Sequence, residues 1–140
     1  MKIFISGQID ESEKINKLMK LIKSSGHSIT HDWTATDAFL GDNKSKLDNP
    51  EESGRRAKAD IQGVIDCDVY VLCSDNKNVG KGMYVELGAA LALKQAGIAS
   101  SPEIYIIGPL NHMSIFYLHP LVKRRDNIEI VLEEISKVHV

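Results

Sequence analysis

Two carboxylates stand out because of the residues around them. Asp60 lies in a segment with amphipathic, helical periodicity, and Glu86 lies near the start of a second predicted helix, between Val85 and Leu87. A charged residue on a helix is usually solvated, which is the ordinary interpretation of either one. The apolar neighbours of Glu86 favour a partly buried carboxylate instead. Such a group can act as an acid, a base or a nucleophile.

The elements that position these carboxylates alternate between strands and helices. Near-continuous apolar runs, and one weaker run, predict strands at residues 2–6, 28–33, 69–73 and 104–107. Helical periodicity follows Ser12, Glu51, Gly82 and Asp126. This alternation predicts one α/β domain over residues 1–140. Its doubly wound, five-stranded parallel sheet has the flavodoxin-like order 2-1-3-4-5, with helices on both faces.

A ligand crevice in such a sheet lies beyond the carboxyl ends of the strands. Gly7 and Gln8 follow the first strand, and Gly80 and Gly82 begin a helix after the third, where backbone amides can approach an anion. The chain carries neither a complete dinucleotide fingerprint nor a Walker loop. Trp33 ends the second strand, where an indole either stacks on a nucleobase or anchors the core. Both interpretations remain open.

Residues 34–50 show little periodicity and many polar residues, which predicts a long connection and a candidate lid over the crevice. Arg55 and Arg56 follow it, and such a pair either contacts a phosphate or is solvated on a helix surface. His112, Tyr117 and His119 lie in the loop after the fourth strand.

Composition limits the class of partner. The chain has 140 residues, 43% of them hydrophobic, and a formal net charge of -2 from 17 basic and 19 acidic residues. This balance provides no field that attracts nucleic acid or an anionic membrane. Cys67 and Cys73 lack zinc-site spacing and are interpreted as reduced core residues. The first apolar run is too short for a signal peptide, so we expect a cytoplasmic protein.

Three segments together form a more specific pattern. They are Ile3-Phe4-Ile5-Ser6-Gly7-Gln8-Ile9, the stretch from Asp60 to Val71, and Gly80-x-Gly82 followed by Tyr84-Val85-Glu86-Leu87-Gly88-Ala89. Together they resemble the nucleoside 2-deoxyribosyltransferase family, including the related deoxynucleoside monophosphate N-glycosidases. The resemblance spans most of the chain.

The resemblance implies cleavage of an N-glycosidic bond, or deoxyribosyl transfer, on a nucleoside or nucleoside 5′-monophosphate. Glu86 is then the nucleophile that forms a covalent sugar ester, and Asp60 protonates or hydrogen-bonds the leaving base. No cofactor or metal is expected, and the implied assembly is a homodimer or larger homo-oligomer. The expected substrate-binding residues are Phe4, Gly7, Gln8, Trp33, Asn78, Gly80 and Gly82.

Two positions depart from the family pattern. Phe4 lies where many members have a tyrosine that orients the nucleophile, and Asn78 lies where transferases carry aspartate and monophosphate hydrolases carry serine. The choice between transfer and hydrolysis therefore stays open. Two other functions also remain: a catalytically silent nucleotide-binding module, and an NAD glycohydrolase.

Overall fold

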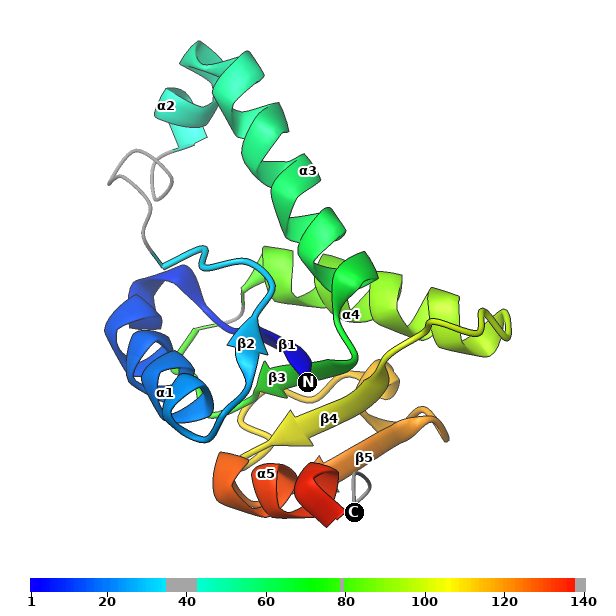
Figure 1. Cartoon of the computed structure of the whole chain (residues 1–140). Helices are drawn as coiled ribbons and strands as arrows, with labels where there is room; N and C mark the ends of the chain where they lie inside the picture. The colour runs from blue at the N-terminus through cyan, green and yellow to red at the C-terminus, as the bar shows by residue number, and fades with distance from the viewer. Residues whose placement is uncertain (35–42, 79, 138–140) are drawn as a thin grey trace.

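The computed structural model describes residues 1–34, 43–78 and 80–137, and it confirms the predicted α/β architecture (Figure 1). Within these residues a sheet of five parallel strands has the order β2-β1-β3-β4-β5, as predicted. The strands are β1 (Lys2–Ser6), β2 (Ser28–Ile29), β3 (Val69–Cys73), β4 (Glu103–Ile107) and β5 (Val122–Arg125).

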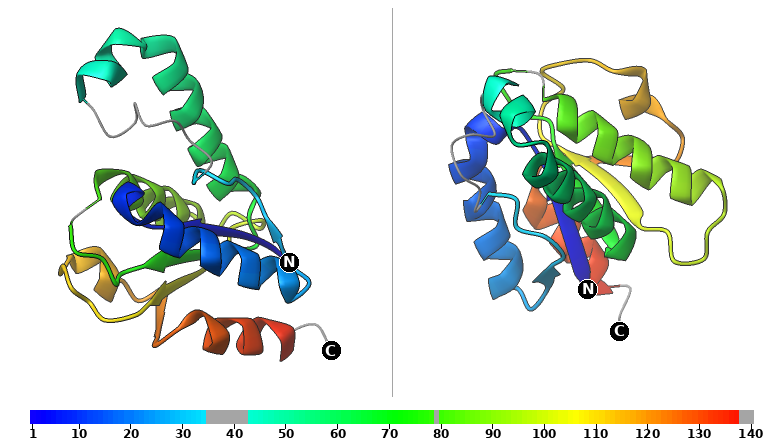
Figure 2. Two further views of the ribbon diagram at one scale, coloured as in Figure 1. Left: turned by 90° about the vertical axis from the view of Figure 1, so that its left-hand side faces the viewer. Right: turned by 90° about the horizontal axis from the view of Figure 1, so that it is seen from above.

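Helices cover both faces of this sheet. Figures 1 and 2 show α3 and α4 on one face and α1 and α5 on the other. The helix bounds are α1 (Ser12–Ser24), α2 (Asn43–Asp48), α3 (Pro50–Asp66), α4 (Lys81–Gln95) and α5 (Ile128–Lys137), with short 3-10 turns η1 (Ile9–Glu11) and η3 (Ile115–Leu118). No helix among the described residues is long and apolar enough to cross a membrane.

The hydrophobic core explains the strand order. All five residues of β3 are buried, because this strand lies at the centre of the sheet with helices on both sides. β1 lies between β2 and β3 in the sheet. After β1 the chain forms β2 on one side of it, and after α3 it forms β3 on the other side. The switch point therefore lies between β1 and β3, and the ends of these strands at Ser6 and Cys73 mark where ligands bind in sheets of this topology.

Three elements differ from the sequence-based expectation. The second strand stops at Ile29, and the chain then turns at Asp32, whose carboxylate accepts a hydrogen bond from the Thr34 amide at 2.9 Å. The short helix α2 lies within the connection predicted at residues 34–50, of which residues 35–42 lie outside the described residues. The fifth strand is the polar edge segment Val122–Arg125, which apolar periodicity does not reveal.

Candidate active site

Glu86 lies on the face of α4 that packs against the sheet. Its neighbours on this face are Met83, Leu87, Ala90 and Leu91, which recur at helical spacing and are all buried. The carboxylate residue is itself only 7% exposed. Helical periodicity therefore places a charged group in a stripe of otherwise apolar side chains, at the crevice end of β1 and β3.

The carboxylate of Glu86 has one direct hydrogen-bond donor from the end of β1. The hydroxyl Oγ of Ser6 donates to Oε1 of Glu86 at 2.6 Å, and Ser6 is fully buried. Burial raises the pKa of Glu86 to about 8, although the Ser6 hydrogen bond lowers it and the nearby charge of Asp60 raises it further. Glu86 is therefore a strongly perturbed carboxyl group, as is common at functional sites.

Asp60 lies on α3 and is the second carboxyl group of the candidate site. The charge of Asp60 acts on Glu86, so the structure brings together two carboxylates that are distant in sequence. Oδ1 of Asp60 lies 3.2 Å from Nε2 of His31, which follows β2. Burial raises the pKa of Asp60, and the charge of His31 opposes this increase.

Phe4 belongs to the core under this site. It is fully buried and stacks on Tyr70, with ring centroids 6.0 Å apart and planes inclined by 8°. The sheet register pairs these two residues across β1 and β3. The structure therefore gives Phe4 a packing position beneath the cleft, and places a tyrosine hydroxyl beside it on the next strand.

Gly7, Gln8 and Gly80 lie where β1 and the start of α4 approach each other. A Cβ atom built on Gly7 would come within 2.7 Å of the end of the Ile15 side chain, so a larger residue there would require Ile15 to move. A Cβ atom on Gly80 would lie 3.4 Å from Oε1 of Gln8, which itself accepts the Ile9 amide at 2.7 Å. Gly82, in the first turn of α4, faces open space instead.

Trp33 is an anchor of the core in this structure. It is 7% exposed, and its indole Nε1 donates to the carbonyl of Ile5 at 2.7 Å. This hydrogen bond ties the segment after β2 to β1. Of the two interpretations of Trp33, the core role has direct structural support.

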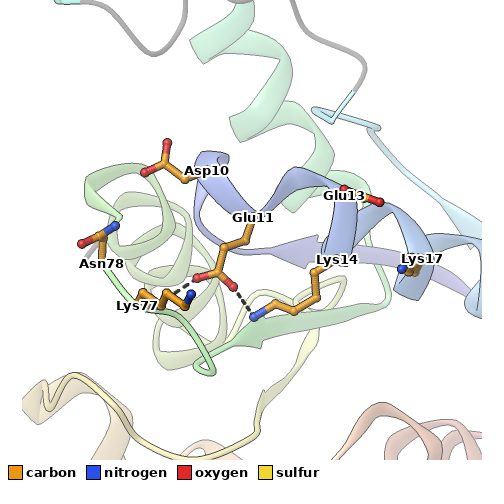
Figure 3. Close-up of a pocket in the computed structure, with 7 residues that line it drawn as sticks. All are labelled: Asp10, Glu11, Glu13, Lys14, Lys17, Lys77 and Asn78. Atoms are coloured by element: carbon orange, nitrogen blue, oxygen red, sulfur yellow. Dashed lines mark hydrogen bonds and ion pairs between the residues drawn. The ribbon is translucent and has the colours of Figure 1, made fainter.

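Asn78 lines a separate hollow of about 490 Å³ between α1 and the loop after β3 (Figure 3). Glu11 lies at its centre, where it pairs with Lys14 and accepts the Lys77 amide at 2.9 Å. The lining residues are Asp10, Glu11, Glu13, Lys14, Lys17, Lys77 and Asn78, and so include neither Glu86 nor Asp60.

The other residues singled out from the sequence form contacts within the protein or are buried. Arg55 and Arg56 both pair with Glu52 on α3. His112 contacts the Lys77 carbonyl at 3.1 Å, which connects the loop after β4 to the loop after β3. Cys67 and Cys73 are buried free thiols. In the part of the chain that the structure describes, no three His, Cys, Asp or Glu residues gather closely enough to hold a metal ion.

Comparison with known proteins identifies the family of this chain. A family model described as nucleoside 2-deoxyribosyltransferase matches residues 3–108, a range that holds residues 3–6 of β1 together with Asp60, β3 and Glu86. The chain belongs to the nucleoside 2-deoxyribosyltransferase family. Membership supports cleavage or transfer at a glycosidic bond as the class of reaction. No curated protein matches the chain in sequence.

A solved structure has the same fold as this chain. It is the CMP N-glycosidase BcmB of Clostridium botulinum, which is 16% identical and superimposes with a TM-score of 0.56. The match covers 99% of each chain. The common fold therefore includes β5 and α5, which lie beyond the family match.

Sequence reasoning missed three residues of this site. The sequence alone places Ser6, Tyr70 and His31 only within predicted strands, at residues 2–6, 69–73 and 28–33. The signal for Ser6 and Tyr70 is the presence of a hydroxyl in an otherwise apolar strand, because a buried hydroxyl needs a partner. The partner itself is set by the sheet register, which sequence periodicity does not fix.

Proposed function

We propose that this protein breaks the N-glycosidic bond of a nucleoside or nucleoside 5′-monophosphate, with Glu86 as a covalent nucleophile. The observation that carries the proposal is the buried Glu86 carboxyl at the crevice end of the sheet, hydrogen-bonded by Ser6 and influenced by the charge of Asp60. A carboxylate beneath an anomeric carbon, with a second carboxyl group nearby, is the arrangement that retaining glycosidases use.

In the first step an oxygen of Glu86 forms a bond to C1′ of the sugar. The bond between C1′ and the base nitrogen breaks, and its electron pair stays with the base. Asp60 supplies the proton that neutralises the leaving base. In the second step water or another base attacks C1′, the bond between C1′ and Glu86 breaks, and the proton of the attacking group returns to Asp60. The acceptor alone therefore decides between hydrolysis and transfer.

The ionisation of the two carboxyl groups fits a pair that shares one proton. The reaction needs Glu86 as a carboxylate and Asp60 as an acid, whereas burial raises the pKa of Glu86 to about 8. Most singly protonated molecules therefore carry the proton on Glu86, and a minority carry it on Asp60 in the reactive arrangement. The net charge of the pair is the same whether the proton lies on Glu86 or on Asp60.

The test is incubation with deoxynucleosides, ribonucleosides, their 5′-monophosphates and NAD, with the released base measured by chromatography. We expect release from at least one nucleoside or nucleotide, and a loss of several orders of magnitude in Glu86→Gln. Glu129→Gln, an exposed change on α5, is the matched control and should keep full activity. Binding without release would favour the silent nucleotide-binding module, and release from NAD alone would favour a glycohydrolase.

We also propose that the protein works as a homo-oligomer. Several apolar side chains on α4 and η3 are exposed, including Val85 at 63%, Ile115 at 78% and Phe116 at 54%. Val85 directly precedes Glu86, so a second copy packed here would lie close to the site. Light scattering tests this assembly: a monomeric mass across the working concentration range would contradict it.

A further inference from the structure

An open apolar groove lies on the outer side of α4, next to η3. It has a volume of about 470 Å³, and its walls include Gly88, Leu91 and Ala92 of α4 and Phe116 of η3. Figure 2 shows α3 along one side of α4 and η3 along the other, and the outer face of α4 between them is exposed. Glu86 lies on the opposite face, against the sheet, so the groove is separate from the candidate active site.

The outer face of α4 lacks charged side chains along most of its length. Between Gly82 and Leu93 the only charged residue is Glu86, which is buried. The exposed positions of this stretch are Gly82, Val85, Gly88 and Ala92. A surface helix normally carries polar residues on its outer face, whereas a helix that is apolar all round is normally buried. α4 therefore has the composition of a helix that another molecule covers.

Large apolar side chains protrude beside the groove. Among the described residues eight such side chains are exposed, and six of them belong to α4, the turn after it or the segment around η3. These six are Val85, Ile98, Met113, Ile115, Phe116 and Leu118. A monomeric protein rarely exposes so much apolar surface in one region. The same region carries both a groove and the side chains that can fill one, as the two-fold interface of a homodimer requires.

The charges at the two ends of α4 favour an antiparallel partner helix. Lys81 is exposed in the first turn of α4, at the positive end of its own helix, and no acidic residue lies in that turn. The C-terminal end of a helix carries a partial negative charge that attracts cations. When two α4 helices pack antiparallel, Lys81 of each lies near the C-terminal end of the other. A strongly acidic or basic partner would find no matching charge between these ends.

We propose that the groove binds a second copy of this chain, with the two α4 helices antiparallel about a two-fold axis between Gly88 and Ala92. The exposed stripe on α4 is symmetric about that point. Gly88 of one copy packs on Ala92 of the other, and Val85 packs near Gln95. Phe116 of each copy then borders the helix of the other. The proposal rests on the proposed homo-oligomer, and it names the surface that forms it.

Disulfide cross-linking tests the position of the two-fold axis. Gly88→Cys and Ala92→Cys, one of them carrying an affinity tag that changes its mass, are mixed in the reduced state, left to exchange subunits and then oxidised. Cys67 and Cys73 are buried, so the new thiols are the accessible ones. Facing Cα atoms about 4.4–6.8 Å apart allow a disulfide bond. We therefore expect the cross-linked mixed dimer as the main product.

The chain offers a matched control for this experiment. A Cβ atom on Gly88 would meet nothing within 4 Å, and the same holds for Gly54, which is exposed on α3. Mixing Gly54→Cys with Ala92→Cys should give about tenfold less mixed dimer, because the two positions do not face each other in the proposed pair. Equal yields from the two mixtures would overturn the proposal.

A charge in the groove tests whether this surface holds the oligomer together. Gly88→Glu places two carboxylates close to the two-fold axis, where they repel each other and lose water. We expect its mass by light scattering to fall to that of the monomer at a concentration where the wild type is a dimer. Gly54→Glu, the same change on α3, should keep the wild-type mass. Far-UV circular dichroism checks that both variants are folded, and a folded Gly88→Glu of wild-type mass would overturn the proposal.

These outcomes are distinguishable from a failure of the proposed reaction. A wild type that is monomeric, or an oligomer that Gly88→Glu leaves intact, would overturn the α4 interface even when base is released from a nucleoside or nucleotide. Cross-linking between positions 88 and 92 in a protein that releases no base from any of these substrates would support the interface and contradict the proposed reaction.

Discussion

Nε2 of His31 lies 3.2 Å from Oδ1 of Asp60, which joins the segment after β2 to the middle of α3. Both side chains are about one-third exposed, at 31% and 32%. The charge of His31 opposes the increase in the pKa of Asp60 that burial causes. His31 therefore partly offsets the effect of burial on the proposed acid, whereas Ser6 hydrogen-bonds the proposed nucleophile.

Replacing His31 with asparagine should raise the pKa of Asp60, because the positive charge that stabilises its carboxylate is lost. Below the lower pKa of the carboxyl pair both groups are protonated and Glu86 cannot attack. The acidic limb of kcat/KM should therefore move to higher pH in His31→Asn, while the alkaline limb stays in place. A profile that keeps its acidic limb would show that His31 does not act on Asp60.

The wild-type profile of kcat/KM against pH should be bell-shaped, with its alkaline limb near pH 8, the pKa of Glu86. Above this pH the pair loses its last proton, so Asp60 has none to donate. Asp60→Asn should be slower by about 10²–10⁴-fold, least with a good leaving base. This variant needs only ionised Glu86, so its kcat/KM should rise with pH to a plateau. An alkaline limb that persists in Asp60→Asn would contradict the shared proton.

Glu86 should make the protein less stable as pH rises. The folded state keeps the proton of Glu86 up to about pH 8, whereas the unfolded state loses it near the ordinary pKa of 4.5. The folded state therefore binds more protons between these values, and stability falls as pH increases through this window. Glu86→Gln does not titrate. Its free energy of unfolding should exceed that of the wild type by an amount that grows through the window, to on the order of 5 kcal/mol.

Urea unfolding of both proteins at about pH 5 and about pH 9 measures this difference. Other titrating groups are the same in the two proteins, so their contributions cancel. If the difference in the free energy of unfolding between Glu86→Gln and the wild type is the same at both pH values, the pKa of Glu86 is not raised in the folded state.

Two glycines of α3 give a matched pair for packing under the cleft. A Cβ atom on Gly63 would lie 2.8 Å from the ring of Phe4 and 2.9 Å from Cβ of His31, whereas one on Gly54 would contact nothing within 4 Å. Gly63→Ala should therefore destabilise the fold by about 1–3 kcal/mol despite the better helix propensity of alanine. Gly54→Ala should stabilise it by about 0.5–1 kcal/mol. Chemical denaturation of both variants checks the pair, and equal effects would contradict the close packing at Gly63.

Much of the fold follows from local sequence patterns. The apolar run Val69–Cys73 has the composition of a central parallel strand, and the apolar neighbours of Glu86 indicate its burial. The edge strand Val122–Arg125 has too few apolar residues for periodicity to locate it. The contacts of Ser6, Tyr70 and His31 depend on strand register and on the path of the chain after β2, which are tertiary properties. They could not be predicted from spacing alone.

The central claim is that Glu86 forms a covalent bond to the sugar. A 2-fluoro-substituted nucleoside or nucleotide with a good leaving base slows the second step and should trap the intermediate, since fluorine disfavours the positive charge that develops as the ester breaks. Mass spectrometry of the intact protein should then show one sugar-sized addition, located on the peptide that contains Glu86 and missing in Glu86→Gln. Release of the base with no addition to the protein, or an addition on another residue, would contradict the account.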